Sequence, residues 1–221
     1  METQQQVLWS DASRSEQSPH LSLEQLRREA AACRACDLWA NATQTAFGEG
    51  PADARLMFIA EAPGEHEDEQ GRPFVGPAGR LLDQALEQAD IPRESVYLTN
   101  IVKHRPWLLQ GPRKKNRPPR QSEIKACAPW LHGELEIVRP EIVVCVGAPA
   151  AKVILGKEFR LTQQRGQWFN TPTIPYVLAT IHPAYVLIQP EESFDFWRGT
   201  LFADFQQIAE KLAALPDQRA A

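Results

Sequence analysis

The four cysteines of this chain stand in a pattern that is typical of metal ligands. They are Cys33, Cys36, Cys127 and Cys145; the first two form a C-x-x-C pair and the second two are more widely spaced. Thiolates are soft ligands, and four of them suit a tetrahedral zinc ion or an iron–sulfur cluster. Because the two pairs lie far apart in the sequence, a shared metal centre would fasten the N-terminal segment to the middle of the chain. The first prediction is therefore a structural metal centre.

The same cysteines also fit a redox dithiol, disulfides or buried free thiols. A redox C-x-x-C motif usually follows a strand and opens a helix, whereas this pair closes a polar, amphipathic stretch at residues 21–32. The first residues, METQQQVLWSDASRSEQ, lack the apolar core of a signal peptide, and no apolar run approaches membrane-spanning length. We therefore expect a cytoplasmic protein with reduced cysteines and no membrane association.

One segment differs in charge from the rest of the chain. The 221 residues have a net charge of −4, which by itself argues against nucleic acid as a partner, but between residues 103 and 125 the only acid is Glu123. The basic residues there are Lys103, Arg105, Arg113, Lys114, Lys115, Arg117, Arg120 and Lys125. Such a segment attracts phosphates even on an acidic protein, because salt screens distant charge. Its prolines and Gly111 predict an extended loop, and an ordinary solvated loop is the alternative interpretation.

Apolar periodicity predicts alternating strands and helices. Strands are expected at residues 55–60, 96–102, 141–146 and 176–181, and helices at residues 21–33, 79–89, 122–138, 148–155 and 193–215. This alternation predicts an α/β fold with a central, mostly parallel, four-stranded sheet and helices on both faces. Residues 21–221 are expected to form a single three-layer αβα domain. The polar residues 1–20 are expected to be a disordered tail.

Three clusters of polar or aromatic residues follow the predicted strands. The segment 60–79 follows the first strand, Asn100 lies near the end of the second, and HPAYVL at residues 182–187 follows the fourth. Ligands of parallel α/β sheets bind beyond the carboxyl ends of the strands. Each cluster alone has an ordinary structural explanation, but their convergence on one edge predicts a site. Segment 60–79 lacks both G-x-G-x-x-G and a GK[ST] ending, so we expect no nucleotide-binding loop.

Together these segments resemble the iron–sulfur uracil-DNA glycosylases, usually called family 4, and especially the uracil-trapping branch called UdgX. The resemblance covers residues 21–215. It rests on CRAC with the two distant cysteines, FGEGP at 47–51, EAPGEHEDEQGRPFVGPAGRLL at 61–82, YLTNIVKHR at 97–105, NRPP at 116–119 and HPAYVL. It implies a DNA repair enzyme of base excision repair. Such an enzyme flips uracil out of DNA and hydrolyses its N-glycosidic bond, which leaves free uracil and an abasic site.

The resemblance implies a set of uracil-binding residues. Phe74 would stack on the flipped base, and the side-chain amide of Asn100 would pair with uracil and mispair with cytosine. His182 would donate a hydrogen bond to the uracil oxygen that becomes negative as the bond breaks. Ala62 belongs to the same uracil-binding set.

The resemblance also implies catalytic, DNA-binding and metal-binding residues. Glu61 would orient the attacking water near the sugar, and Glu67 matches a second acidic position; with His182 they form the predicted catalytic set. Leu187 would insert into the base stack. The predicted DNA-binding residues are Lys103, Arg105, Arg113, Lys114, Lys115, Asn116, Arg117 and Leu187. One [4Fe–4S] cluster on Cys33, Cys36, Cys127 and Cys145 would organise the DNA-binding surface, with zinc as the alternative occupant.

Several positions depart from the family pattern. Ala60 stands in place of a glycine. Ala184 stands in place of a serine and Ile188 in place of an arginine, so two potential phosphate contacts are lost at these last two positions. UdgX proteins carry a histidine in the basic segment that attacks the sugar and stays attached to DNA; Asn116 occupies that position here. Because an amide nitrogen is a very poor nucleophile, we expect turnover.

Two alternative functions remain open from the sequence. The first is a UdgX-like protein that binds uracil-DNA covalently or tightly with little turnover, with His104 as an alternative nucleophile. The second is a zinc-stabilised α/β hydrolase acting on another substrate, which would be colourless, whereas an iron–sulfur protein is brown. For the glycosylase we expect a monomer whose partner is uracil-containing DNA.

Overall fold

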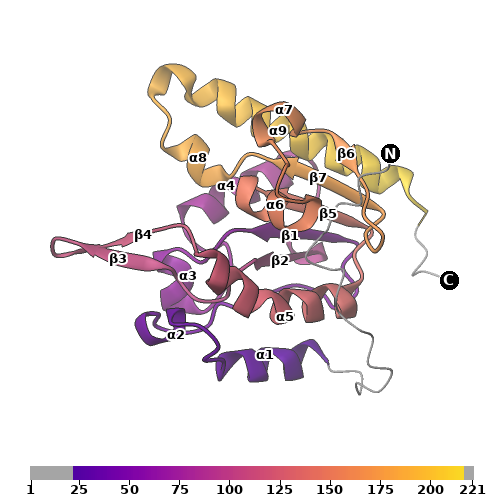
Figure 1. Cartoon of the computed structure of the whole chain (residues 1–221). Coiled ribbons are helices and arrows are strands. Elements are labelled where there is room, and N and C mark those ends of the chain that lie inside the picture. The colour runs from indigo at the N-terminus through magenta and orange to yellow at the C-terminus, as the bar shows by residue number, and fades with distance from the viewer. Residues whose placement is uncertain (1–21, 217–221) are drawn as a thin grey trace.

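A five-stranded sheet forms the centre of the described part of the chain. The computed structural model describes residues 22–216, and their main sheet has the strand order β2-β1-β5-β7-β6 (Figure 1). Its strands are β1 (Leu56–Ala60), β2 (Val96–Asn100), β5 (Ile142–Val146), β6 (Trp168–Phe169) and β7 (Tyr176–Thr180). β1 is parallel to β2 and β5, and β5 is parallel to β7, whereas β6 is antiparallel. The carboxyl ends of the four parallel strands therefore lie at one edge.

The parallel strands are apolar on both faces because helices cover both faces. β1, β2 and β5 are buried along their whole length. Alternate side chains enter two separate cores, with Phe58 and Val144 in one and Met57 and Val143 in the other. This is the period of two expected for strands.

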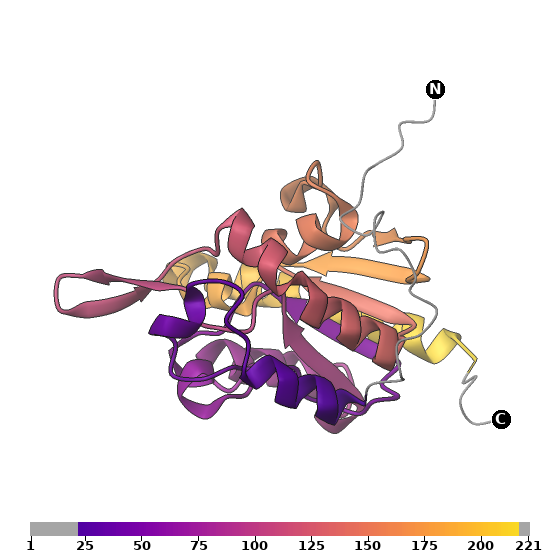
Figure 2. The same cartoon turned by 60° about the horizontal axis from the view of Figure 1, so that its bottom comes forward.

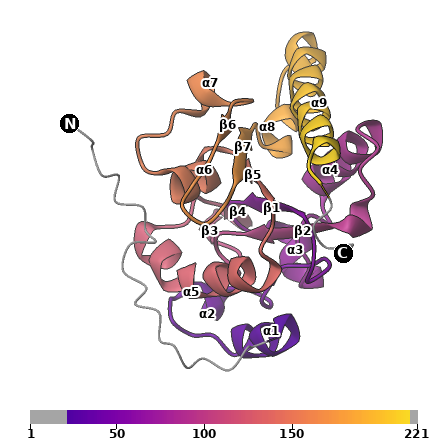
Figure 3. The ribbon, with the colours of Figure 1, turned by 90° about the vertical axis from the view of Figure 1, so that its right-hand side faces the viewer.

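Two layers of helices enclose the sheet. α4 (Pro77–Gln88) and α9 (Glu191–Ala214) cover one face, and α5 (Gln121–Val138) and α6 (Ala148–Leu155) cover the other. α1 (Leu23–Ala31) packs on the outer side of α5, as Figures 2 and 3 show. The short helices are α2 (Leu38–Asn41), α3 (Glu65–Gln70), η1 (Arg93–Ser95), α7 (Leu161–Gln164) and α8 (Pro183–Leu187). No helix within residues 22–216 has the length and apolar character needed to cross a membrane.

The predicted α/β fold is confirmed, and all four predicted strands and all five predicted helices are present within a few residues. The predicted strand number is wrong, because β6 adds a fifth strand at the sheet edge that is too short to show periodicity. α3 and α8 escaped prediction because each is only one or two turns long and starts beside a glycine or proline. The predictions for residues 1–20 and for the last five residues fall outside the described residues.

The basic segment forms a β-hairpin, so the prediction of an extended loop is wrong. β3 (Trp107–Gln110) pairs antiparallel with β4 (Arg113–Asn116). Gly111 in the turn has a φ of 61°, which glycine adopts without a steric penalty. We call residues 107–116 the hairpin arm, because they project from the body of the molecule (Figure 1).

A buried ion pair lies between β2 and α5. The Lys103 ammonium donates to Glu134 Oε2 at 2.6 Å and to the Asn100 carbonyl at 2.9 Å, and both charged side chains are at most 1% exposed. Glu134 also accepts from the Tyr97 hydroxyl and from the Gly48 backbone amide. The prediction that Lys103 contacts DNA is therefore wrong, because its charge is turned into the protein interior.

Removing one partner of this pair should destabilise the protein strongly. Glu134→Leu leaves the Lys103 ammonium buried and uncompensated, and such losses cost about 3–5 kcal/mol. We expect a large fall in the thermal unfolding midpoint of Glu134→Leu and a smaller fall in the double variant Lys103→Met/Glu134→Leu, which buries no charge.

The exposed pair between Arg72 and Glu49 is a matched control. Glu49→Gln should change stability by at most about 1 kcal/mol. Additive effects of Lys103→Met and Glu134→Leu on the unfolding midpoint would contradict the coupled ion pair.

Candidate active site

A cavity of about 610 Å³ opens at the carboxyl ends of the parallel strands. It is bounded by the segment after β1, the end of β2, the base of the hairpin arm and α8. The predicted site residues that line it are Glu61, Ala62, Glu67, Phe74, Asn100, Asn116, Arg117, His182 and Leu187. The structure thus brings together side chains from four separate parts of the sequence.

Strand register positions two polar residues of the cavity. Asn100, the last residue of β2, is opposite Ala60, the last residue of β1, and Glu61 follows directly. Asn100 is only 3% exposed, and Lys103 holds its backbone carbonyl from below. Burial raises the pKa of Glu61, because desolvation disfavours the carboxylate. A carboxyl group with a raised pKa and a buried amide therefore share the cavity.

Phe74 forms an apolar wall of the cavity and is 6% exposed. Its φ of 56° is unusual for a residue with a side chain. Gly79 lies beneath it, where an added Cβ would come within 1.8 Å of the Phe74 carbonyl oxygen. The rings of Phe74 and His182 are nearly parallel, with centroids 6.5 Å apart. The aromatic face is thus held by a strained backbone that only a glycine at position 79 permits.

The Glu67 carboxylate holds two segments of the cavity wall together. Oε1 accepts from the backbone amides of Val75 (3.0 Å) and Gly76 (2.8 Å), and Oε2 accepts from that of Gly64 (3.1 Å). This carboxylate therefore fixes the Phe74 loop against the start of α3.

His182 is a neutral hydrogen-bond donor. It caps α8, and its Nδ1 accepts from the Ala184 backbone amide at 3.1 Å. Burial lowers the pKa of His182 to about 4, and the negative charge of Glu67 opposes this only in part. A neutral imidazole whose Nδ1 accepts a hydrogen bond carries its proton on Nε2. The ring therefore offers an N–H donor at the cavity without a positive charge.

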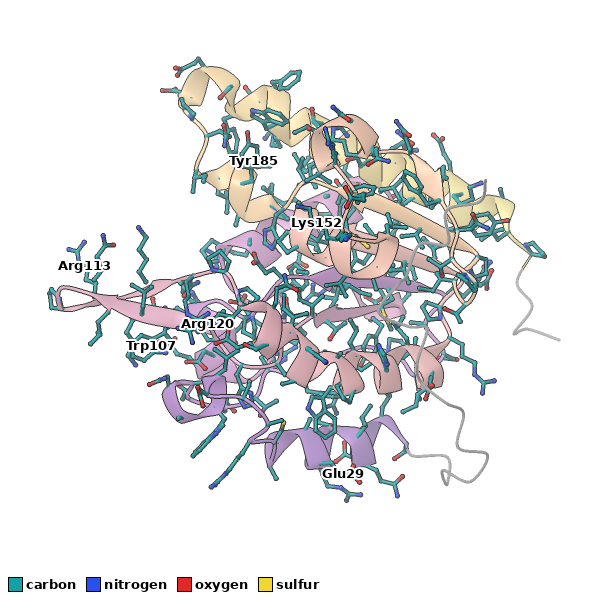
Figure 4. The ribbon with its side chains drawn as sticks, in the orientation of Figure 1. Glu29, Trp107, Arg113, Arg120, Lys152 and Tyr185 are labelled. Carbon is teal, nitrogen blue, oxygen red and sulfur yellow. The ribbon has the colours of Figure 1, made fainter. Side chains whose placement is uncertain are left out.

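The hairpin arm supplies the remaining wall. Asn116 and Arg117 line the cavity, whereas Arg113, Lys114 and Lys115 lie exposed further along β4. Figure 4 shows Arg113 far out on the arm, with Trp107 on the opposite side. The Lys114 ammonium lies 4.5 Å from the centroid of the Trp107 ring.

Arg105 lies behind this wall, and the prediction that it contacts DNA is wrong. It is 5% exposed and donates to Asn116 and Glu65. His104, the alternative nucleophile, is also buried; its Nε2 lies 2.9 Å from Thr45 Oγ1, and it does not line the cavity. Two lining residues with titratable side chains were missed, Glu65 and His66. Their position in the EAPGEHEDE segment was the available signal.

Three of the four cysteines lie near one another: Cys33 and Cys36 follow α1, and the charges of both contribute to the shift in the pKa of Cys127 on α5. Cys127 and Cys145 lie in the same core, and Cys36 packs against it. The Sγ of Cys33 accepts from Trp130 Nε1, and that of Cys127 accepts from the Lys103 backbone amide, both at 3.2 Å. All four cysteines lie within the described residues, and none of them forms a disulfide bond.

Burial governs the chemistry of these thiols. Burial raises the pKa of Cys127 to about 11 and raises the pKa of Cys145 further. Negative charge on Cys36 and Cys33 also raises the pKa of Cys127, by a smaller amount. Among residues 22–216, no three His, Cys, Asp or Glu side chains converge on a single metal ion. Without a bound cation, the two deepest sulfurs are therefore neutral thiols.

The fold is similar to that of a solved structure. The chain matches the crystal structure of SMUG2 from Pedobacter heparinus with a TM-score of 0.53, over 72% of this chain and 77% of that one. Sequence identity is 13%, so this likeness concerns the fold alone.

Sequence comparisons assign the family. The model of the uracil DNA glycosylase superfamily matches residues 47–212. The type-4 uracil-DNA glycosylase of Sulfurisphaera tokodaii is 39% identical over 88% of this chain and 86% of its own length. That of Thermotoga maritima is 41% identical over 70% of this chain and 78% of its own length. The chain therefore belongs to the uracil DNA glycosylase superfamily and, within it, to the type-4 uracil-DNA glycosylases.

Proposed function

We propose that this protein excises uracil from DNA by hydrolysing the N-glycosidic bond, with release of free uracil and formation of an abasic site. The observation that supports this most strongly is the neutral Nε2–H donor of His182 in the same cavity as Phe74 and Asn100. The type-4 uracil-DNA glycosylases to which the chain is related act, by their name, on uracil in DNA.

The floor of the cavity suits recognition of a flipped pyrimidine. Phe74 offers a ring on which the base stacks, which contributes about 1–3 kcal/mol in comparable sites. The Asn100 amide both donates and accepts, as the edge of uracil requires. A base with the wrong pattern would leave this buried amide unpaired, and the loss makes the selection strong. Ala62 leaves room beside the base because its side chain is a single methyl group.

His182 and Glu61 are the proposed catalytic residues. As the bond between the sugar carbon and uracil breaks, the bonding electron pair moves onto uracil, and His182 Nε2–H stabilises the negative oxygen. Glu61 orients a water molecule that adds its oxygen to the sugar carbon. One proton of that water ends on the uracil anion, so neutral free uracil and an abasic site result. Glu67 acts as a positioning residue, because three backbone amides already occupy its carboxylate.

DNA contacts are proposed on both sides of the cavity. Arg113, Lys114 and Lys115 on the hairpin arm, with Arg117 at its base, attract the phosphate backbone. Leu187, 41% exposed at the end of α8, enters the base stack in place of the flipped nucleotide. The exposed apolar surface continues at Ile188, which supports a wedge here.

The four cysteines are proposed to hold one [4Fe–4S] cluster. Cys33 and Cys36 follow α1, Cys127 lies on α5 and Cys145 on β5, and two of the sulfurs accept N–H hydrogen bonds, which tune cluster ligands. Each thiolate of a cluster binds a different iron, whereas the four ligands of a zinc ion converge on one point. The cluster would fasten α1 and α2 to α5 and β5, and no catalytic step passes through it.

Water is the proposed acceptor of the sugar, in preference to a covalent trap. Asn116 lines the cavity at the position where a covalent trap would need a histidine imidazole to attack the sugar. An amide nitrogen is a poor nucleophile for that attack. His104 is buried outside the cavity. His66 lines the cavity rim and is exposed.

Turnover is the first prediction of this proposal. With a uracil-containing oligonucleotide in excess, each protein molecule should release several molecules of uracil, and a denaturing gel should show no protein–DNA adduct. His182→Leu should lower kcat by about 100- to 1,000-fold, the usual cost of losing one donor to a developing oxyanion. A denaturant-resistant adduct formed by the wild type would contradict turnover, and His66→Ala would then be the first variant to test.

His182 should remain neutral throughout the range in which the enzyme is assayed. With a pKa of about 4 in the folded protein, its ¹⁵N signals should show the Nε2–H tautomer from about pH 5 to about pH 8. The unfolded chain takes up this proton near pH 6.5, so this residue lowers stability as the pH falls from about 6.5 to about 4. The ¹⁵N signals that are missing from the spectrum of His182→Gln identify those of the His182 ring. A titration midpoint near pH 6.5 for these signals would contradict the lowered pKa of His182.

Iron content tests the cluster independently of activity. Protein purified without oxygen should be brown and contain about four iron atoms per chain. Cys145→Ser should lose most of the iron, whereas Ser122→Ala, in the first turn of α5, should retain it. Stoichiometric zinc with no iron would contradict the proposal.

A further inference from the structure

A chain of three polar side chains ends at Asn116. Arg105 Nε donates to Asn116 Oδ1 at 2.7 Å, and Arg105 Nη1 donates to Glu65 Oε1 at 3.2 Å. Arg105 is 5% exposed and lies outside the cavity lining, whereas Glu65 and Asn116 both line the cavity. The guanidinium is therefore a buried link between α3 and the hairpin arm.

This link fixes which end of the Asn116 amide faces the cavity. A guanidinium has donors only, so the Asn116 atom that faces Arg105 must be the oxygen. The nitrogen Nδ2 then lies on the other side, 3.7 Å from where a Cβ on Gly64 would stand. Within residues 22–216 Nδ2 has no hydrogen-bond partner. The wall presents a free N–H donor.

The backbone beneath Asn116 is fixed as well. Asn116 pairs with Trp107 in the hairpin arm, and the Arg117 amide donates to the Pro106 carbonyl at 3.0 Å. Trp107 is held in turn, because its Nε1 donates to the Asn41 carbonyl at 2.8 Å. With the backbone held, rotation of the side-chain amide is the main freedom left, and the bond to Arg105 removes it.

We propose that Arg105 is a positioning residue that orients Asn116 so that Nδ2 donates to a phosphate oxygen of the flipped nucleotide. This inference rests on the proposed function. Asn116 is exposed at the mouth of the cavity, whereas the base-recognition residues Asn100 and Phe74 are buried at its floor. When a base enters such a cavity, its phosphates stay at the mouth. An amide N–H is a common phosphate donor in protein–DNA contacts.

The isosteric variant Asn116→Asp isolates the donor. Aspartate keeps an oxygen for Arg105 but replaces N–H with a negative oxygen at the cavity. With DNA containing a non-hydrolysable 2′-fluoro uracil nucleotide, Asn116→Ala should weaken binding by about tenfold, the usual effect of losing a hydrogen bond to a charged group. Asn116→Asp should weaken it further. Binding by Asn116→Asp at the wild-type level would overturn the inference.

A double-mutant cycle separates positioning from general stabilisation. Arg105→Met should weaken binding about as much as Asn116→Ala, and Arg105→Met/Asn116→Ala no more than either single variant. Arg105→Lys keeps one donor and should restore part of the affinity. Additive losses would show that Arg105 acts independently of Asn116 and would overturn the inference. Thermal unfolding and iron content of each variant show whether it is folded.

Salt dependence gives a readout that a structural defect does not change. Neither Arg105 nor Asn116 displaces counterions from DNA in this scheme. Arg105→Met and Asn116→Ala should therefore leave the slope of log K against log salt concentration unchanged. Arg113→Ala, which removes an exposed arginine, should reduce the slope by about 0.9 with duplex DNA. The same reduction in Arg105→Met would mean that Arg105 contacts phosphate directly, against the inference. If the wild type binds this DNA but releases no uracil from the corresponding unmodified uracil-containing DNA, the proposed function fails, whereas the cycle still tests the contact.

Discussion

The buried ion pair of Lys103 and Glu134 joins the parts of the molecule on which the site depends. Through its ammonium, Lys103 holds the backbone of Asn100, and through its own amide it donates to the sulfur of Cys127. Glu134, on α5, also holds Gly48 and Tyr97. A lysine this deep is tolerated only with a matched carboxylate. The position of Asn100, the proposed base-recognition residue, is therefore set by electrostatics inside the protein.

Two glutamates of one short segment have different environments, and their chemistry differs accordingly. Glu67 is occupied by three backbone amides, so it holds the Phe74 loop in place. Glu61 is desolvated, and its raised pKa marks a carboxyl group whose charge is not fully compensated. Sequence position alone does not distinguish them. The number of N–H donors around each carboxylate does, and it supports the proposed roles, which are positioning for Glu67 and reaction for Glu61.

The sequence predicted best what depends on strand ends. Asn100 ends one buried apolar strand and His182 follows another, so their convergence follows from parallel topology. Lys103 and Arg105 were misassigned because a run of basic residues was taken as a surface feature, and their partners Glu134 and Glu65 are remote in the sequence. The hairpin arm was missed because its second strand, RKKN, has low β-propensity. Long-range pairing decides such positions, and local patterns do not contain it.

The packing of α1 on α5 has a consequence for how the chain is made. During synthesis α1 leaves the ribosome long before α5, since about 90 residues separate them; at about 5–20 residues per second this delay lasts several seconds. Through that interval Leu26 and Ala30, buried in the finished protein, have no helix to cover them. Cys33 and Cys36 likewise leave the ribosome well before Cys127 and Cys145, the other two proposed cluster ligands. The nascent chain thus passes through a stage in which the thiols of Cys33 and Cys36 are accessible to oxidants and to metal ions.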